Sequence, residues 1–455
     1  MTDKIRMTDK IQMTEKTNIV TEKIQMTEFK TNICNLTETE LISFVDGHLH
    51  VNTQCKKDFG EVFTCSTLIN KMLDHLPSCV WKNPSLTWLE PSCGIGSFMV
   101  MVYLRLMKGL QEWCSDSMER SEHIIKNMLY MVELNMDNVV ICKRLFSNVY
   151  CANFLEWNTS AKYNIILGNL PFQSKSCLGG KNKLYEKMME RCLDLYKDYV
   201  LVITPDNIFS GGSKLYKRLL EHRMRMIDFS KSNQMFFPGI QQFICYFLVE
   251  GFGNIPISNI PISNTPISNT QIICNDGSCM EIVLKNRPVN PVRDWNVRTE
   301  QLIEKYVSNS KNNVIYNRGK SLQMYFTDPS MIKDSPNSFD SPNSFDSLNS
   351  FDSPNSFTLI YTPKQYLYTD RKELAIGIGI PKIVIFGISV KYEFREDFSG
   401  EYGVGPNTFY VPVRDLEHGT KIVAFLKSEE YKLMVMSTKT NRQFLKCSFL
   451  QHLCF

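Results

Sequence analysis

The stretch YNIILGNLPFQ, residues 163–173, joins a mostly apolar run to Gly168 and then to Asn169-Leu170-Pro171-Phe172. A short apolar run that ends in glycine and proline predicts a buried β-strand. The carboxyl end of this strand carries an amide and an aromatic ring. Pro171 also favours an extended conformation at Leu170, which stiffens the direction of the Leu170 carbonyl. This strand end is therefore a candidate binding site.

Strand-like and helix-like segments alternate on both sides of this stretch, between Thr64 and Glu250. The runs MLYMVEL and YVLVITP read as strands, whereas STLINKMLDHL and KLYEKMMERCLDLYKD have helical spacing. Such alternation predicts an α/β fold with a doubly wound, mostly parallel sheet. Ligands bind at the carboxyl ends of the strands in these sheets, so residues at those ends are the functional candidates.

The composition sets broad limits on the class of protein. The chain has 455 residues, of which 43% are hydrophobic, enough for two ordinary cores. Its net charge of +4 is mild, so composition alone does not indicate a nucleic-acid partner. No pair among the 15 cysteines has C-x-x-C spacing, which favours reduced thiols in an intracellular, reducing compartment and no structural zinc. No long apolar run or secretory signal is apparent, so we expect no membrane partner.

Three repetitive segments accompany the patterned regions: residues 1–35, 254–270 and 334–357. The first is rich in threonine, acid and lysine, and the other two in proline, serine and asparagine. These compositions do not suit a packed core, so we expect a low-complexity tail and two repeat insertions. The rest of residues 271–455 mixes strand-like runs such as PKIVIFGISVKYEF with a helical pattern, which predicts a mixed α+β domain.

Three further strand ends carry residues suited to a nucleoside. In LEPSCGIGSF, Gly94 and Gly96 form a turn before a helix, where the backbone can approach a ligand closely; a purely structural tight turn is the alternative. Glu133 ends the next strand, where a carboxylate can accept hydrogen bonds from ribose hydroxyls; an exposed helix-capping acid is the alternative. Asn153 and Phe154 follow a third strand and could meet an adenine ring, or form a turn beside the core.

Residues 169–172 fit a planar amine. The amino group of adenine is a poor nucleophile because its lone pair is delocalised into the ring. Two acceptors aimed at the amino hydrogens would localise this lone pair, and the side-chain oxygen of Asn169 and the carbonyl of Leu170 can supply them. Phe172 offers a face on which a base can stack. An asparagine-proline turn beside a core aromatic residue is the alternative.

Taken in order, the segments FGEVFTC, LEPSCGIGSF, MVEL, CANF and GNLPF resemble the motif series of the DNA N6-adenine methyltransferases. These are the S-adenosyl-L-methionine-dependent modification enzymes of restriction systems and large viruses. The motif order is similar to the gamma arrangement, and the resemblance covers residues 59 to about 250. Three positions depart from the family pattern: Leu170 replaces a proline, Cys65 stands where proline is usual, and Asn153 replaces an aspartate.

The resemblance implies a Rossmann-like methyltransferase sheet in a catalytic domain, residues 36–253, followed by a DNA target-recognition domain, residues 271–455. It implies a cofactor site made of Phe63, Thr64, Glu90, Pro91, Gly94, Gly96, Phe98, Glu133, Asn153 and Phe154. It implies that Asn169, Leu170, Pro171 and Phe172 are catalytic, and that Phe172 and Phe237 stack on a flipped-out base.

The implied reaction is direct methyl transfer from S-adenosyl-L-methionine to N6 of adenine in double-stranded DNA, without a metal. A separate cognate endonuclease as partner stays open. RNA adenine or protein glutamine methylation are alternatives, because those enzymes share the pocket chemistry, and a catalytically decayed DNA-binding module is another. The GEVFT segment and the large C-terminal region favour DNA.

The C-terminal region also carries basic residues interleaved with tyrosines: Lys364, Arg371, Lys372, Lys382 and Lys391 with Tyr366, Tyr368 and Tyr392. We expect these residues to contact DNA phosphates; a charged, solvated surface without a partner is the alternative.

Overall fold

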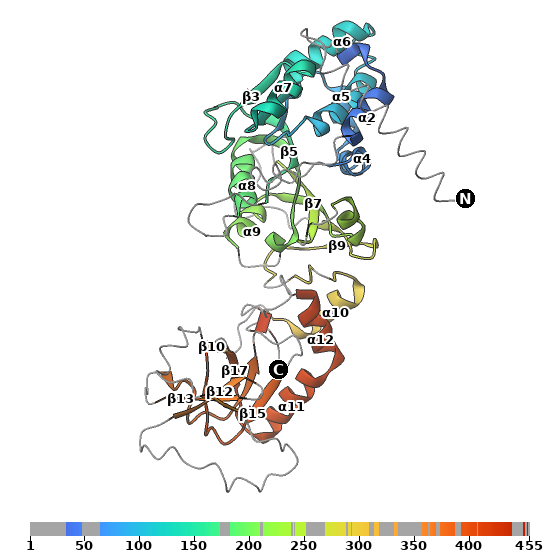
Figure 1. Ribbon diagram of the computed structural model, residues 1–455. Coiled ribbons are helices and arrows are strands. Elements are labelled where there is room, and N and C mark those ends of the chain that lie inside the picture. Colours follow the sequence, from blue (N-terminus) through green and yellow to red (C-terminus); the bar gives the residue numbers. More distant parts are fainter. Residues whose placement is uncertain are drawn as a thin grey trace, which may run out of the picture. The chain divides into compact units, whose positions relative to one another are not determined.

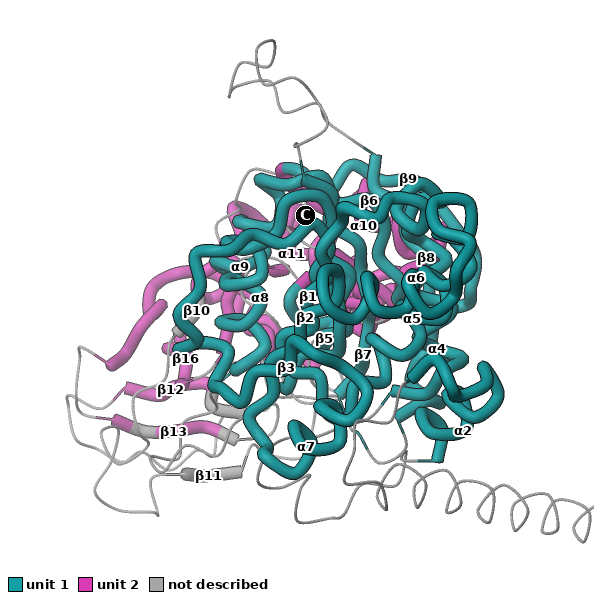
Figure 2. Tube along the Cα trace, turned by 90° about the horizontal axis from the view of Figure 1, so that it is seen from above, with its two compact units in different colours: residues 1–208, 213–285 teal, residues 209–212, 286–455 magenta. Residues whose placement is uncertain are grey.

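The computed structural model divides the chain into two compact units, coloured separately in Figure 2: residues 1–208 with 213–285, and residues 209–212 with 286–455. The structure describes residues 33–47, 64–172, 183–209, 213–237, 240, 242–251, 269–287, 290–292, 294–308, 314–317, 332–334, 357–362, 365–369, 374–386, 393–406, 408–438, 449–450 and 453. The repeat segments therefore lie almost entirely outside the described residues. So does Phe63.

A single sheet organises the first unit. Its strands are β1 (Trp88–Glu90), β2 (Leu129–Glu133), β3 (Asn148–Cys151), β4 (Tyr163–Asn169), β5 (Tyr196–Pro205), β6 (Arg223–Asp228), β7 (Ile244–Glu250), β8 (Thr270–Ile273) and β9 (Cys279–Ile282). Within the described residues they pair in the order β3-β2-β1-β4-β5-β7-β6-β8-β9. Strands β1 to β5 run parallel, and β7 runs antiparallel between β5 and β6. This confirms the predicted α/β class with a mostly parallel, Rossmann-like sheet.

Helices lie on both sides of this sheet, with α4 and α5 on one side and α8 and α9 on the other (Figure 1). Their bounds are α2 (Glu38–Gly47), α4 (Ser66–Leu73), α5 (Ser97–Gly109), α6 (Ser117–His123), α7 (Met136–Leu145), α8 (Leu184–Leu195) and α9 (Lys214–Leu219). Shorter helical turns are η1 (Ile33–Asn35), η2 (Ser78–Lys82), η3 (Ile124–Met128), η4 (Asp206–Phe209) and η5 (Lys231–Phe236). Because both faces of the sheet are covered, the central strands are continuous apolar runs.

The apolar run Tyr163–Asn169 forms the central strand β4. In β4, Ile165 and Leu167 are fully buried in the same core as Trp88 of β1 and Leu201 of β5. Burying a side chain of this size contributes about 1.5–3 kcal/mol, so the core holds the register of β4 firmly. The polar residues that follow the strand are thereby placed at a fixed edge of the sheet.

The boundary between the two units lies later in the chain than the sequence suggests. Strand β8 pairs in parallel with β6, and β9 pairs with β8, so residues up to 285 belong to the first unit. From the sequence pattern, the second domain is expected to begin at residue 271. The difference arises because pairing across the 254–270 insertion is a long-range contact that local patterns do not reveal.

The second unit contains, within its described residues, two four-stranded sheets and three helices, as expected for a mixed α+β domain. One sheet has the order β10-β17-β14-β15, from β10 (Ile315–Asn317), β17 (Thr408–Pro412), β14 (Lys382–Phe386) and β15 (Phe394–Asp397). The other has the order β11-β13-β12-β16, from β11 (Ile332–Asp334), β13 (Gln365–Thr369), β12 (Phe357–Thr362) and β16 (Gly403–Val404). The helices are α10 (Val297–Tyr306), α11 (Leu416–Lys427) and α12 (Glu429–Thr438).

One expected phosphate contact in this unit is wrong. Lys382 is 0% exposed and forms an ion pair with the equally buried Asp397. A lysine whose side chain is enclosed in this way cannot reach a phosphate. The ring of Tyr366 packs 5.2 Å from that of Tyr402 and 4.7 Å from the guanidinium of Arg395, and Tyr368 lies in β13. Lys364, Arg371, Lys372, Lys391 and Tyr392 lie outside the described residues.

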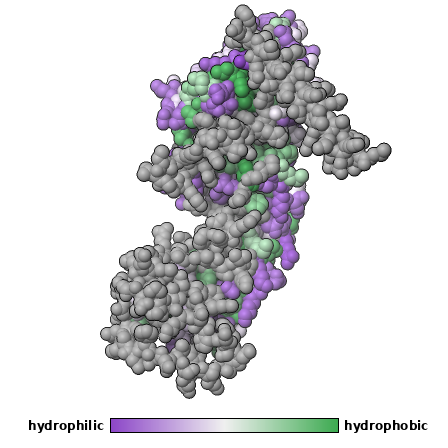
Figure 3. All heavy atoms as spheres, viewed as in Figure 1, coloured by the Kyte–Doolittle hydropathy of each residue, from purple (hydrophilic) through white to green (hydrophobic). Residues whose placement is uncertain are grey.

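On the face in Figure 3, hydrophilic residues cover much of the described surface between smaller hydrophobic areas. Among the described residues, no helix is both long enough and apolar enough to span a membrane.

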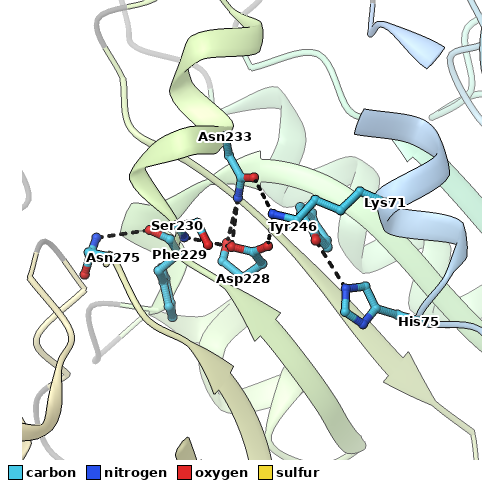
Figure 4. A network of polar contacts seen from close by, with 8 residues as sticks. All are labelled: Lys71, His75, Asp228, Phe229, Ser230, Asn233, Tyr246 and Asn275. Carbon is cyan, nitrogen blue, oxygen red and sulfur yellow. Dashed lines mark hydrogen bonds and ion pairs between the residues drawn. The ribbon is translucent and has the colours of Figure 1, made fainter. Parts of the chain in front are cut away.

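A buried polar network joins α4 to the end of β6 (Figure 4). Asp228 accepts hydrogen bonds from Lys71 Nζ at 2.7 Å, from the Ser230 backbone N–H at 2.7 Å and from Asn233 Nδ2 at 3.0 Å. Burial acts to raise the pKa of Asp228, but the hydrogen bonds from Lys71, Ser230 and Tyr246 outweigh it and leave the pKa below its ordinary value. The ionised carboxylate is therefore stabilised in the folded protein.

Replacing this carboxylate should weaken the fold in a pH-dependent way. A depressed pKa contributes stability above the unfolded-state pKa, and this contribution is lost as pH falls through the folded-state pKa. We expect Asp228→Asn to lower the free energy of unfolding at pH 7 by about 2 kcal/mol, because Lys71 can still reach water. Urea unfolding should show the difference shrinking below the ordinary aspartate pKa of 3.8. The control is Asp74→Asn, which breaks an exposed ion pair with Arg105. If Asp228→Asn lowered the free energy of unfolding by as little as this control, the stabilising role of the Asp228 carboxylate would be contradicted.

Candidate functional site

A cavity lies at the carboxyl ends of β1, β2, β3 and β4. Most of the predicted site residues line it: Thr64, Glu90, Pro91, Gly94, Phe98, Glu133, Asn153, Phe154, Asn169, Leu170, Pro171 and Phe172. Segments separated by more than a hundred residues in the chain therefore meet at one place. The parallel sheet produces this convergence, because it brings the ends of successive strands to the same edge.

Two predicted site residues are not part of the cavity lining. Gly96 has a φ of 84° at the start of α5, and a Cβ atom there would lie 3.3 Å from Cys142 Sγ, so this glycine shapes the turn instead. Phe237 follows η5 with its side chain 2% exposed, packed in the core of the first unit. Phe237 is therefore not among the residues that line the cavity, and its stacking on a flipped-out base stays a prediction. An aromatic ring after a helical turn such as η5 can pack in the core or contact a ligand, and in this structure it packs in the core.

Glu133 links the segments that follow β1 and β2 by hydrogen bonds. Its Oε2 accepts a hydrogen bond from the Gly94 backbone N–H and its Oε1 accepts one from the Asn135 backbone N–H, both at 2.7 Å. The side chain of Asn135, not that of Glu133, caps α7 by accepting from Asp137 N–H. Glu133 is therefore not the exposed capping acid that was the alternative interpretation. Its carboxylate lies at the cavity wall.

Two buried polar atoms at the cavity have no hydrogen-bond partner among the described residues: Glu90 Oε2 and Ser97 Oγ. Glu90 is 2% exposed, and burial, with smaller contributions from Cys142 and Glu133, raises the pKa of its carboxyl well above the ordinary 4.5. A buried polar atom without a partner costs about 1–3 kcal/mol. Such atoms at a cavity wall fit a ligand that supplies hydrogen bonds or positive charge.

The raised pKa of Glu90 has a measurable consequence for stability. For an acid whose pKa is higher in the folded state, stability declines as pH rises from the unfolded-state pKa toward the folded-state pKa. Glu90→Gln removes this titration, so we expect its melting temperature to exceed that of the unmodified protein by about 2–4 °C at pH 8. The gap should narrow toward pH 4.5. Thermal unfolding across this pH range, with the surface change Glu112→Gln as control, measures it; a gap independent of pH would contradict the account.

Hydrogen bonds fix Asn169 through both its side chain and its backbone. Asn169 Nδ2 donates to Thr64 Oγ1 at 3.3 Å, and Ser92 Oγ donates to the Asn169 backbone oxygen at 3.2 Å. The next N–H, that of Leu170, donates to the Ile203 carbonyl on β5 at 3.4 Å. Phe172 lines the cavity with its ring edge-on to that of Tyr185, 6.5 Å between centroids. The segment after β4 is thus anchored, and Asn169, Leu170, Pro171 and Phe172 all line the cavity.

Asn153 is a turn asparagine that also lies in the cavity lining, and its contact with an adenine ring stays a prediction. Its Oδ1 accepts from Leu155 N–H at 3.1 Å, which makes it a turn asparagine, and it also lines the cavity. Phe154 is nearly buried beside it, with the Arg191 guanidinium 5.4 Å from the ring centroid. The wall at the end of β3 is therefore apolar with one amide.

Several residues of the cavity lining are not among the predicted site residues: Ser92, Cys93, Ser97, Leu134, Ala152, Leu184 and Met188. Ser97 could have been found, because it follows Gly96 at the start of α5, where helix N–H groups are free. Leu184 and Met188 reach the cavity from α8, and nothing in their local pattern separates them from core residues. Among the described residues, no group of three or more His, Cys, Asp or Glu is arranged to hold a metal ion.

Comparison with known proteins supports the resemblance seen in the motifs. Residues 103–236 match the family model described as Eco57I restriction-modification methylase. This range includes Glu133, Asn153 and residues 169–172 of the cavity. A protein of Mycoplasma pneumoniae described as an uncharacterized adenine-specific methylase is 32% identical over 134 residues, which are 27% of this chain and 31% of that relative. The match thus spans about a third of the relative's length. The resemblance to adenine methylases of restriction-modification systems is confirmed over the matched segment.

Solved structures of restriction-modification proteins are also similar to this chain. The type IIL restriction-modification enzyme MmeI, solved in complex with DNA, has a TM-score of 0.49 at 13% identity, covering 92% of this chain and 70% of that one. The methyltransferase subunit of a type I restriction-modification system from Streptococcus thermophilus has a TM-score of 0.33 at 12% identity, covering 49% and 50% of the two chains.

Proposed function

We propose, from the match of residues 103–236 to the Eco57I restriction-modification methylase family, that the chain is an S-adenosyl-L-methionine-dependent methyltransferase acting on N6 of adenine in DNA. The observation that carries this proposal is the convergence of four strand ends on one cavity. There, the anchored Asn169 amide faces the same space as the carboxylates of Glu90 and Glu133.

The cavity walls fit the chemical parts of the proposed cofactor. Glu133 would accept hydrogen bonds from its ribose hydroxyls, and Asn153 with Phe154 would contact its adenine ring. The partnerless Glu90 Oε2 and Ser97 Oγ would satisfy polar groups of its methionine part. When bound, S-adenosyl-L-methionine supplies a methyl group made electrophilic by the neighbouring sulfonium.

The remaining chemistry falls to the segment after β4. Asn169 Oδ1 and the Leu170 carbonyl would accept the two hydrogens of the target amino group, which concentrates its lone pair on nitrogen. Phe172 would stack on the base and offset part of the few kcal/mol that unstacking from the duplex requires. The nitrogen then loses its extra proton to water. Leucine at position 170 is compatible with this role, because the role uses the backbone carbonyl only.

The second unit, residues 209–212 and 286–455, would be the target-recognition domain that binds double-stranded DNA. Its size favours DNA over the compact methyltransferases that act on RNA or on protein glutamine. A separate endonuclease would complete a restriction-modification pair. A reducing, intracellular compartment is proposed from the scattered cysteines and the DNA substrate.

The proposal is tested by offering tritiated S-adenosyl-L-methionine and the purified protein to duplex DNA of mixed sequence, to RNA and to a cell protein extract in parallel. We expect label in DNA only. Label confined to RNA or to protein would replace the DNA assignment with the corresponding alternative. Cofactor binding without label in any substrate would favour a catalytically decayed DNA-binding module.

A further inference from the structure

The amide of an asparagine has two chemically opposite ends of nearly equal shape, and only one of them can accept a hydrogen bond. Rotation of the Asn169 side chain by half a turn would place its NH₂ group where the carbonyl oxygen has to meet the substrate. The catalytic power proposed for Asn169 therefore requires contacts that hold the NH₂ end elsewhere. The hydrogen bond from Asn169 Nδ2 to Thr64 Oγ1, at 3.3 Å, is such a contact.

We propose that Thr64 is a positioning residue for methyl transfer: its hydroxyl holds the NH₂ end of the Asn169 amide, so that the oxygen end serves the substrate. This deepens the proposed function and rests on it. It differs from the contact with cofactor that the motif resemblance implies for Thr64. The side chain is suited to the task, because it is 2% exposed and a β-branched residue has few rotamers.

The position of Thr64 is set by α4, which begins two residues later. The side chain of Cys65, the residue at the cap position of α4, does not cap the first turn of the helix. Asp46, at the end of α2, takes over this role: its Oδ1 accepts from Ser66 N–H at 2.8 Å and its Oδ2 from Ser66 Oγ at 2.7 Å. The first turn of the helix beside Thr64 is thereby fixed to a second helix.

The last turn of α4 is fixed as well. Lys71 donates to Asp228 at 2.7 Å and to Asn233 Oδ1 at 3.2 Å, and His75 just beyond the helix contacts Tyr246 of β7 (Figure 4). A helix anchored at both ends to other elements cannot shift along its axis without breaking charged hydrogen bonds. The fixed position of α4 therefore holds the Thr64 hydroxyl next to Asn169.

Thr64→Val keeps the shape of the side chain and removes the acceptor. We expect the single-turnover rate of methyl transfer to fall about fivefold, the effect of one ordinary hydrogen bond, with the cofactor Kd changed by less than about twofold. Thr64→Ser should recover most of this loss. The matched control is Thr270→Val, since Thr270 is equally 2% exposed in the same unit and its hydroxyl donates to the Met224 carbonyl, away from the cavity. It should leave the rate unchanged.

A double-mutant cycle separates positioning from direct cofactor contact. If Thr64 acts through Asn169, Thr64→Val should cause no further loss of rate in an Asn169→Ala background. The same fivefold loss in both backgrounds, or a loss confined to cofactor binding, would overturn the inference while leaving the proposed function intact. Absence of transfer by the unmodified protein would overturn the proposed function, and this positioning role with it.

Discussion

Asn169→Ala is expected to lower the single-turnover rate of methyl transfer by about two to three orders of magnitude, the range found when one preorganised hydrogen-bonding group is removed from an active site. Alanine cannot accept a hydrogen of the target amine, so the lone pair stays delocalised in the ring. Cofactor affinity should change little, because Glu133 and Glu90 lie on other strands. Quenched single-turnover reactions with labelled cofactor, together with equilibrium binding, separate the two quantities.

The matched control for this prediction lies on the same strand. Asn164, near the start of β4, accepts from the Thr87 backbone N–H at 3.0 Å and lies outside the cavity lining. Asn164→Ala should reduce stability and leave the rate per folded molecule unchanged. Equal losses of rate in both variants would indicate a general effect on β4 and would remove the special role given to Asn169.

Glu133→Gln is expected to raise the cofactor Kd by about 100-fold. Both carboxylate oxygens accept backbone N–H groups, from Gly94 and Asn135, so a glutamine must place its own NH₂ against one of these donors. The turn after β1 is then disturbed, and the charged acceptor for ribose is lost as well. Hydrogen bonds to a charged group contribute about 1.5–3 kcal/mol each, which corresponds to a change of this size in Kd.

Isothermal titration with S-adenosyl-L-methionine, in the absence of DNA, measures this change. The exposed Glu122→Gln serves as the control, since Glu122 contacts only the surface Lys126 in the described part of the chain. Saturating cofactor should restore much of the transfer rate in Glu133→Gln but not in Asn169→Ala. A Kd within about threefold of the unmodified protein would contradict the assignment of Glu133 to the cofactor.

The sequence predicted the strand ends well because the signal there is local. Buried parallel strands are continuous apolar runs, and the first polar residue after each run marks its end, as at Glu90, Glu133 and Asn169. The parallel arrangement then places these ends together without further information. This is why the cavity could be predicted as a set before any contact was known.

Features that depend on long-range packing could not be predicted in the same way. Whether Phe237 turns into the core or toward a ligand depends on neighbours from other strands, and the pairing of β8 with β6 crosses a repetitive insertion. Lys382 reads as a surface cation in the sequence, and only the position of Asp397 on the neighbouring strand shows that it is buried. The hydrogen bond between Asn169 and Thr64 joins residues 105 positions apart in the chain, so local sequence patterns could not predict it either.

The most direct test of the central claim identifies the methylated atom. Duplex DNA treated with the protein and S-adenosyl-L-methionine is digested to nucleosides and separated by liquid chromatography with mass spectrometry. We expect N6-methyl-2′-deoxyadenosine to be formed by the unmodified protein and to be nearly absent with Asn169→Ala. Methyl groups on cytosine, or on adenine in amounts that Asn169→Ala does not reduce, would contradict the central claim.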